Sequence, residues 1–238
     1  MEFWVYFAAK PLFWLTVTTA VFLFACWVNR MANGSSLVHP VLVSMAILVT
    51  FLVLTDTDYT TYFEGAQFIH FLIGPATVAL AVPLYDHRKR IKEMWLHILI
   101  ACVVGALVAM VSAILIAKWF GLPNELLLTL APKSVTTPIA IGIVEKIGGI
   151  SSLAAGFVLI TGVMGGFMAP LVFKFLNIKD DAVKGFALGL SSHGLGTAVA
   201  IEMSAVAGAF SGLAMGLTGL ITAFLVPIVV HLLGISPP

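Results

Sequence analysis

An all-α polytopic membrane protein is the fold class that the sequence predicts. Of the 238 residues, 61% are hydrophobic and 10% are charged, whereas soluble domains have roughly 45–50% apolar and about 25% charged residues. Apolar runs of about 18 residues or more, the length of a membrane-spanning helix, recur from end to end. We expect about six full transmembrane helices and two interrupted segments in one transmembrane domain over 1–238, with the inverted-repeat architecture of transporters.

Six apolar stretches predict the full helices, and two further stretches carry a polar interruption. The first stretch lacks a small-residue cleavage site, so we expect a retained helix rather than a signal peptide. Cys26 and Cys102 both fall inside apolar spans, which argues against a disulfide or a metal site. The full helices are expected at 12–28, 38–54, 66–84, 94–117, 150–173 and 208–233, and the interrupted segments at 122–148 and 181–207.

The charged loops set the orientation of these helices. The stretch "DHRKRIKE" from Asp86 carries four basic and two acidic residues and is the most basic loop of the chain. The positive-inside rule therefore places it in the cytoplasm. The stretch "TDTDYTTYFEG" from Thr55 has three acids and no base, which suits the outer side. This order places Arg30 inside and the N-terminus outside.

An internal repeat relates the two interrupted segments. A shift of 60 positions aligns "TTPIAIGIVEKIGGISSLAAG" from Thr136 with "GTAVAIEMSAVAGAFSGLAMG" from Gly196, with eight of 21 positions identical. Chance similarity between small apolar residues is the alternative. We expect N-terminal helices in 1–93, then repeat regions in 94–173 and 174–238, each with a full helix and an interrupted segment. Such paired interruptions are typical of secondary-transporter sites.

The path of the interrupted segments decides the symmetry of the repeat. If each segment is a re-entrant hairpin, the helices that follow run in opposite directions and the repeat is inverted. Lys174, Lys179 and Lys184 then fall on the cytoplasmic side, in agreement with the charge rule. If each segment instead crosses the membrane as a broken helix, the repeats are parallel. The lysine positions favour the re-entrant form.

Two charged residues lie at membrane depth, Lys133 and Glu202, and Lys10 is a third candidate near the outer end of the first helix. Ionisable groups at such depth cost several kcal/mol on most estimates and indicate a functional site. A lysine that extends to the nearest interface is the alternative for Lys133. Glu202 is expected either to carry a coupling proton or cation or to pair with Lys133.

The first interruption, "PKSVTTP", has the composition of a break between two half-helices. Pro138 suits the first turn of a new helix, with Thr136 or Thr137 as its cap. The free N–H groups and the positive dipole end of that helix would then point to the membrane centre. Non-helical backbone at that depth requires burial in protein or a water-filled cavity.

In the second interruption, "SSHGLGTA", Gly194 and Gly196 allow the break, His193 lies within it, and Thr197 can start the second half-helix. His193 titrates near neutral pH and is a candidate for the site; a hydrogen-bonded polar residue at a helix break is the alternative. Together the two breaks predict an anion site that suits a small carboxylate with hydroxyl or keto groups. The expected substrate-binding residues are Lys133, Ser134, Thr136, Thr137, Ser191, Ser192, His193, Gly194, Gly196, Thr197 and Thr77, and the expected coupling-ion residues are His193 and Glu202.

Two other motifs have structural explanations. Thr77 follows Gly74 and Pro75 in "GPATVALAVPLY", where a hydroxyl that satisfies a freed backbone carbonyl is the alternative to a substrate contact. Gly162, Gly165 and Gly166 predict close helix packing rather than chemistry. The histidines lack ligand spacing and no nucleophile–base set or cofactor motif is found, so we expect no metal, no cofactor and no enzymatic activity. The net charge of +1 gives no reason to expect nucleic acid as a partner.

The stretches "GPATVALAVPLY", "PKSVTTPIA", "IGGI" and "SSHGLGTA", followed by Glu202, together resemble the LrgB/CidB family, which includes YohK-type proteins. The resemblance covers essentially the whole chain. It implies a multi-pass protein of the bacterial cytoplasmic membrane that acts with a small four-helix partner of the LrgA/CidA type. It further implies one of two activities: holin-like or antiholin-like control of murein hydrolases and autolysis, or transport like that of the related plant chloroplast glycolate/glycerate transporter.

We therefore expect a secondary transporter of small monocarboxylates such as glycolate, glycerate or pyruvate, coupled to protons or sodium. The alternative is a holin-like or antiholin-like modulator of autolysis. A pore has no need of a lysine at membrane depth and two broken segments, which favours transport. We also expect the chain to form homo-oligomers.

Overall fold

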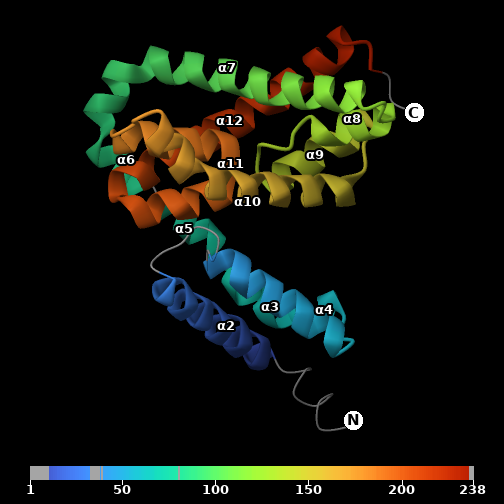
Figure 1. The fold of residues 1–238 in the computed structure, drawn as a ribbon, viewed down its shortest axis with the longest axis vertical. Helices are drawn as coiled ribbons and strands as arrows, with labels where there is room; N and C mark the ends of the chain where they lie inside the picture. The colour runs from blue at the N-terminus through green and yellow to red at the C-terminus, as the bar shows by residue number, and fades with distance from the viewer. Residues whose placement is uncertain (1–10, 33–37, 39, 80, 236–238) are drawn as a thin grey trace. The chain divides into compact units, whose positions relative to one another are not determined.

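All regular secondary structure is helical in this computed structural model, which describes residues 11–32, 38, 40–79 and 81–235 and has no strand among them. The chain divides into two units, Met1–Ala79 and Leu80–Pro238. The first unit contains α2 (Pro11–Met31), α3 (Pro40–Leu54), α4 (Tyr59–Phe71) and α5 (Ile73–Ala79). The second unit contains α6 (Ala81–Asp86), α7 (Arg88–Trp119), α8 (Asn124–Leu130), α9 (Thr137–Ile147), α10 (Ser151–Phe175), α11 (Asp181–Met203) and α12 (Ala205–Leu232) (Figure 1). The all-α prediction is confirmed.

The first unit is built around a buried tryptophan. Trp14 of α2 is fully buried, and its ring packs edge-on against Phe51 of α3 and Tyr62 of α4. The hydroxyls of Thr18 and Tyr62 lie 3.2 Å apart, which adds a polar contact between α2 and α4. This aromatic core holds α2, α3 and α4 together. Lys10 lies outside the described residues.

The predicted start of the third span at residue 66 is wrong. The helix α4 already begins at Tyr59, inside the acidic stretch that the sequence analysis assigned to a loop. The Asp58 side chain accepts a hydrogen bond from the Thr60 N–H and caps the helix, and a carboxylate at a helix N-terminus is favourable. The helix pauses at Leu72, just before Gly74 and Pro75, so the predicted interruption lies next to these residues.

The basic stretch from Asp86 also belongs to a helix rather than to a loop. The helix α7 begins at Arg88 and not near residue 94, since Arg, Lys and Glu are good helix formers and the charged turns extend the apolar span. Arg90 in its first turn pairs with Asp180, at 2.5 Å, immediately before α11. This ion pair links the N-terminal ends of α7 and α11.

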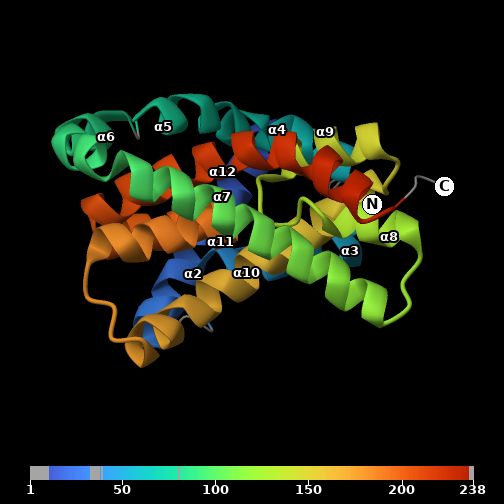
Figure 2. The same cartoon turned by 90° about the horizontal axis from the view of Figure 1, so that it is seen from above.

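The helices α8 and α9 form a hairpin. The hydroxyl of Thr129, near the end of α8, accepts a hydrogen bond from the Ile150 N–H, just beyond the end of α9, at 2.9 Å. If the two helices continued in one direction, these residues would lie about 30 Å apart. The chain therefore turns back between them, and Figure 2 shows α8 near the C-terminal end of α7. A buried cluster joins this hairpin to the C-terminal halves of α7 and α12, through Ile114, Leu128, Ile143 and Val226 among others.

The helix α11 also folds back on itself. It has 23 residues, so a straight helix would separate its ends by about 33 Å. Instead, the side chain of Ser204, directly after its last residue, hydrogen-bonds to the carboxylate of Asp181, its first residue. The turn lies at His193, whose φ of 42° and ψ of −126° are not helical.

The helix α12 packs against both limbs of this second hairpin. A Cβ added at Gly185 would lie 2.0 Å from the carbonyl oxygen of Ala207, and one added at Gly189 would lie 2.0 Å from that of Ser211. The residue number rises by four on both helices from the first pair to the second, so the first limb runs parallel to α12. The returning limb runs antiparallel, since Gly208 faces Ile201 while Ser211 lies beside Thr197. Glycine is required at 185 and 189, because the backbones of the first limb and α12 are in contact there.

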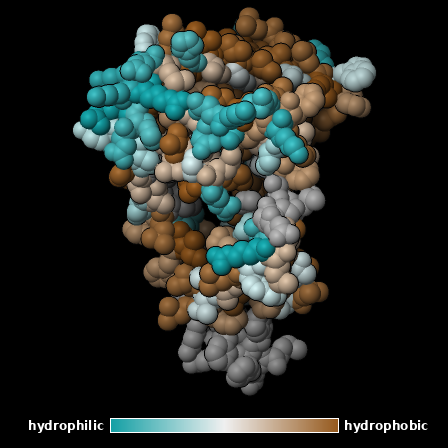
Figure 3. Space-filling model, turned by 60° about the vertical axis from the view of Figure 1, so that its left-hand side comes forward, coloured by the Kyte–Doolittle hydropathy of each residue, from teal (hydrophilic) through white to brown (hydrophobic). Residues whose placement is uncertain are grey.

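Five stretches are long and apolar enough to cross a membrane, judged by length and composition within the described residues: Leu12–Met31, Tyr59–Asp86, Arg88–Trp119, Ser151–Phe175 and Ala205–Leu232. The second predicted span, at 38–54, is found as α3, which has 15 residues and is short of the roughly 20 that a bilayer requires. Large apolar side chains are exposed along these helices, including Ile100, Val104 and Val108 of α7, and apolar residues cover much of the face in Figure 3. A membrane is the solvent that suits such a surface.

Candidate functional site

The first break lies between α8 and α9, where the sequence predicted it. Residues 131–136 form successive turns, with the Lys133 N–H bonded to the Leu130 carbonyl at 3.1 Å. Thr136 is the N-cap residue of α9, in extended conformation, and Pro138 lies in the first turn, as predicted. The Thr136 side chain makes no capping hydrogen bond. The first N–H groups of α9 therefore lack a side-chain cap and remain available to an anion.

Lys133 is a half-buried cation within this break. Its neighbours Pro132, Ser134 and Val135 are buried, and its Nζ donates to the Ser134 hydroxyl at 3.4 Å. It makes no ion pair with a carboxylate of the described residues, so the predicted alternative of a pair with Glu202 is wrong. Among the described residues, this cation therefore has no carboxylate as a counter-charge.

The second break lies at His193 rather than at the neighbouring glycines. The break falls inside the predicted stretch "SSHGLGTA", and the residue with non-helical angles is His193, which was expected within the break, whereas Gly194 and Gly196 are helical. His193 takes the left-handed conformation, and Thr197 already lies within the returning limb, where its hydroxyl donates to the His193 carbonyl at 2.8 Å. Gly196 serves close packing, since an added Cβ would lie 2.4 Å from the Leu188 carbonyl oxygen.

The His193 ring is buried and fixed by one backbone contact. Its Nε2 lies 3.0 Å from the Val158 carbonyl oxygen of α10. A carbonyl oxygen only accepts hydrogen bonds, so Nε2 must carry the proton. In the neutral ring Nδ1 is then an acceptor, and protonation there would make the ring cationic. The contact thus defines which nitrogen of His193 can gain a proton.

The two breaks meet at Val158. The Val158 side chain packs with Val135 of the first break and Ala140 of α9, while the Val158 carbonyl accepts from His193. The structure therefore places the first break, which contains Lys133 and Ser134, and His193 of the second break against the same residue of α10.

Two glycines of α10 make room for the second break. A Cβ added at Gly162 would lie 3.0 Å from His193 Nε2, and one added at Gly165 would lie 1.8 Å from the Ser192 hydroxyl. The predicted close packing at these glycines is confirmed. Ser192 itself is fully buried, and its hydroxyl lies 3.1 Å from that of Ser191.

The remaining predicted residues lie at varying distances from this turn. Ser191 is exposed and donates to the Ala187 carbonyl, while Gly194 is exposed. Glu202 lies nine residues beyond His193, about 13 Å along the helix, near the base of the hairpin. Thr77 belongs to α5 of the first unit, and its side chain lies outside the described residues.

Sequence reasoning missed two groups at the second break. One is the Val158 carbonyl, for which no sequence signal exists because every residue carries one. The other is Ser211 of α12, fully buried, whose hydroxyl lies 2.9 Å from that of Thr197. Ser211 was one of the eight identical positions of the repeat. That identity was the signal.

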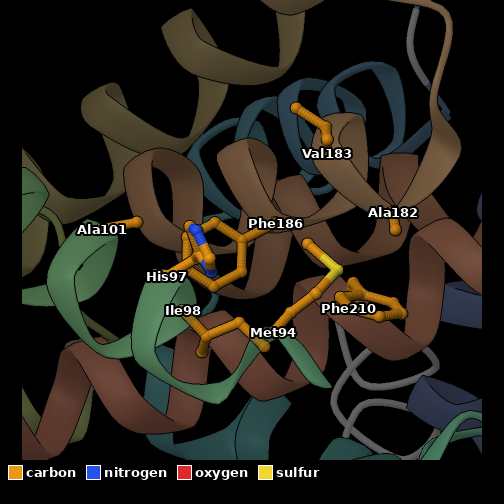
Figure 4. A pocket seen from close by; sticks show the side chains of 8 residues that line it. All are labelled: Met94, His97, Ile98, Ala101, Ala182, Val183, Phe186 and Phe210. Carbon is orange, nitrogen blue, oxygen red and sulfur yellow. The ribbon is translucent and has the colours of Figure 1, made fainter. Parts of the chain in front are cut away.

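A cavity of about 180 Å³ between α7, α11 and α12 lies apart from the breaks (Figure 4). Its lining is mostly apolar, with Met94, Phe186 and Phe210, and His97 is the titratable residue among them. None of the predicted site residues lines it. Among the described residues, no group of three or more His, Cys, Asp or Glu side chains is placed to hold a metal ion.

Comparison with known proteins gives a consistent family. The sequence model of the LrgB-like family matches residues 18–232. The uncharacterized protein YwbG of Bacillus subtilis is 38% identical over 188 residues, which cover 79% of this chain and 84% of YwbG. The antiholin-like protein LrgB of Bacillus subtilis is 33% identical over 225 residues (94% and 97%), and that of Bacillus mycoides is 32% identical over 224 residues (94% and 97%). No solved structure matches.

Proposed function

The chain belongs to the LrgB-like family, and we propose that it is an antiholin-like membrane protein that works by binding and carrying small carboxylate anions. Relatives that cover 94% of the chain bear the name antiholin-like protein LrgB, which supports the first part of the proposal more directly than the second. The geometry of the breaks supports the second part. Both parts hold if control of autolysis follows from the flux of a metabolite.

The observation that carries transport is the meeting of the two breaks at Val158. There Lys133, half-buried and without an ion pair to a carboxylate of the described residues, lies three residues before Thr136, whose side chain does not cap the N-terminus of α9. Both features favour a negative charge. We assign the substrate carboxylate to Lys133 and the α9 N-terminus, and its hydroxyl or keto oxygen to the hydroxyls of Ser134, Thr136 and Thr137. Glycolate, glycerate and pyruvate fit this description.

The two hairpins support an inverted repeat in the membrane. Each is followed by a long helix, α10 after the first and α12 after the second, and the segments align at a shift of 60 residues. If the hairpins are re-entrant from opposite sides, each tip reaches the middle of the protein without crossing it. A carrier can then expose the tips alternately to the two sides.

His193 is the proposed proton carrier. Its Nδ1 is the acceptor in the neutral ring, and a proton there would place a second cation near Lys133, which would favour a bound carboxylate. Proton and anion would then bind together. Glu202, near the hairpin base, is the second candidate, and sodium is the alternative coupling ion.

Uptake into proteoliposomes tests the proposal. Labelled pyruvate, glycolate and glycerate are offered to vesicles that contain the chain with and without an LrgA/CidA-type four-helix partner. We expect saturable uptake that Lys133→Ala and His193→Ala abolish. The exposed Lys179 provides the matched control, and Lys179→Ala should leave uptake intact. Non-saturable leakage of unrelated solutes would refute the carrier and favour a holin-like pore.

The cellular setting is part of the same proposal. We place the chain in the bacterial cytoplasmic membrane, as a homo-oligomer that acts with the four-helix partner. Co-purification of a tagged chain with that partner and with an untagged copy tests both associations. In cells, deletion of the gene should change the rate of autolysis if the antiholin-like part holds, and Lys133→Ala should reproduce the deletion if flux causes it.

A further inference from the structure

A groove of about 290 Å³ runs along α9, between that helix and α12. Its α9 wall extends from Pro138 to Ile147, almost the full length of the helix, and its α12 wall contains Ala223 and Pro227. Pro138 directly follows the first break, whereas Lys146 lies in the last turn of α9. The groove therefore connects the first break to the end of the hairpin, over about 15 Å of helix.

We propose that this groove is the path by which a small hydroxycarboxylate reaches the first break from the side on which α9 ends. The inference rests on the proposed transport function and assigns it an access route and a second set of substrate contacts. Three features of the groove carry it: an open glycine in its wall, a carbonyl without its helical donor, and a cation at its mouth.

Gly142 is the open glycine. A Cβ added there would meet no atom within 4 Å, so no packing contact requires a glycine at this position. A glycine inside a helix costs roughly 0.5–1 kcal/mol relative to alanine. The absence of a side chain instead keeps the middle of the groove wide.

Pro227 supplies the second feature. Proline has no backbone N–H, so the carbonyl of Ala223, one turn earlier in α12, loses its normal helical hydrogen bond. Both residues line the groove. A carbonyl freed in this way at membrane depth needs another donor, such as water or a hydroxyl group of a bound molecule.

Lys146 supplies the charge. It is exposed and makes no ion pair with a carboxylate of the described residues. At the other end of the groove lie the uncapped N-terminus of α9 and, within the break, Lys133. Glu145 is exposed beside Lys146 but does not line the groove. A carboxylate would thus move from one cation towards another, while its hydroxyl group could bond to the Ala223 carbonyl.

Cysteine labelling tests the route independently of uptake. Gly142→Cys is made in a protein with Cys26→Ala and Cys102→Ala, and Gly216→Cys of α12 is the matched control, since Gly216 is also exposed, helical and open. We expect a negatively charged thiol reagent to modify the cysteine at 142 and not the one at 216. Glycolate should slow the modification. The substitution Lys146→Gln should also slow it, because it removes the cation at the mouth of the groove.

The outcomes separate this inference from the transport proposal. If the cysteine at 142 reacts only with an uncharged, membrane-permeant maleimide, the groove faces lipid or a second chain, and the route is refuted even where the wild-type protein takes up substrate. If the charged reagent modifies the cysteine at 142 but the wild-type protein takes up no substrate, the transport proposal is refuted, and so is the assignment of a hydroxycarboxylate to the groove. A size series gives a second readout: Gly142→Ala should retain uptake and Gly142→Leu should lose it, whereas Gly216→Leu should retain it.

Discussion

Replacement of Gly189 by alanine should loosen the second hairpin from α12. The added Cβ would lie 2.0 Å from the Ser211 carbonyl oxygen, 2.7 Å from its carbon and 2.8 Å from its Cα. Ordinary contact begins near 3.4 Å, so the backbones must separate by about 1.4 Å. Overpacking of this kind costs about 1–3 kcal/mol, against a gain of roughly 0.5–1 kcal/mol from better helix propensity. The difference lies between about 0 and 2.5 kcal/mol, and we expect a net loss of about 1 kcal/mol of stability.

Equilibrium unfolding in detergent micelles measures this loss, with Gly216→Ala as the matched control. Gly216 lies in α12 with nothing within 4 Å of an added Cβ, so alanine there should be neutral or stabilising by up to about 1 kcal/mol. The separation also strains the contact between the Thr197 and Ser211 hydroxyls, 2.9 Å apart. Equal stability of the two variants would show that the limbs do not pack as described.

Three further predictions concern the hairpins and their ends. In a protein without its native cysteines, Asp181→Cys and Ser204→Cys should form a disulfide on oxidation, because their side chains are hydrogen-bonded; a straight helix, with ends about 33 Å apart, could not. A cysteine at Glu145 should be labelled by impermeant reagents from the outer side only, and labelling from the cytoplasmic side would contradict the re-entrant form. Asp180→Ala should cost about 1 kcal/mol through loss of its capping bonds and of the Arg90 pair. Although partial burial opposes it, hydrogen bonding from Arg90 and from backbone N–H groups lowers the pKa of Asp180. Its contribution to stability should therefore be complete at neutral pH and lost as the pH falls below the usual 3.8, which unfolding at pH 3 and pH 7 would measure.

The sequence predicted the helices and the existence of both breaks, because their signals are local. Apolar runs fix the spans α10 and α12 to within three residues, and the proline of "PKSVTTP" marks the start of α9. The N-terminal boundaries of α4 and α7 were predicted wrongly, because the local signal there was misleading. Charged residues suggested loops, whereas good helix formers and the Asp58 cap extend both helices beyond the apolar core.

The left-handed conformation of His193 at the second break could not be predicted, because it depends on tertiary packing. Local preference assigns a left-handed conformation to glycine rather than histidine. His193 nevertheless adopts it, although Gly194 and Gly196 follow close behind in the chain. The Val158 carbonyl and the space above Gly162 fix the ring from a different helix. A contact with a residue 35 positions away leaves no local pattern.

Two destabilising features near Val158 bear on the choice between the two proposed activities. A half-buried lysine without an ion pair among the described residues and a buried histidine in a left-handed conformation both reduce stability, and such features persist only where the surrounding structure holds them in place. A protein that acts only by assembling in the membrane gains nothing from either. A ligand with a negative charge would supply a counter-charge to Lys133 and so offset the first cost, and it would also stabilise a protonated His193. For this reason the carrier explains more of the site than an assembly role alone, and loss of uptake in Lys133→Ala is the result on which that reasoning depends.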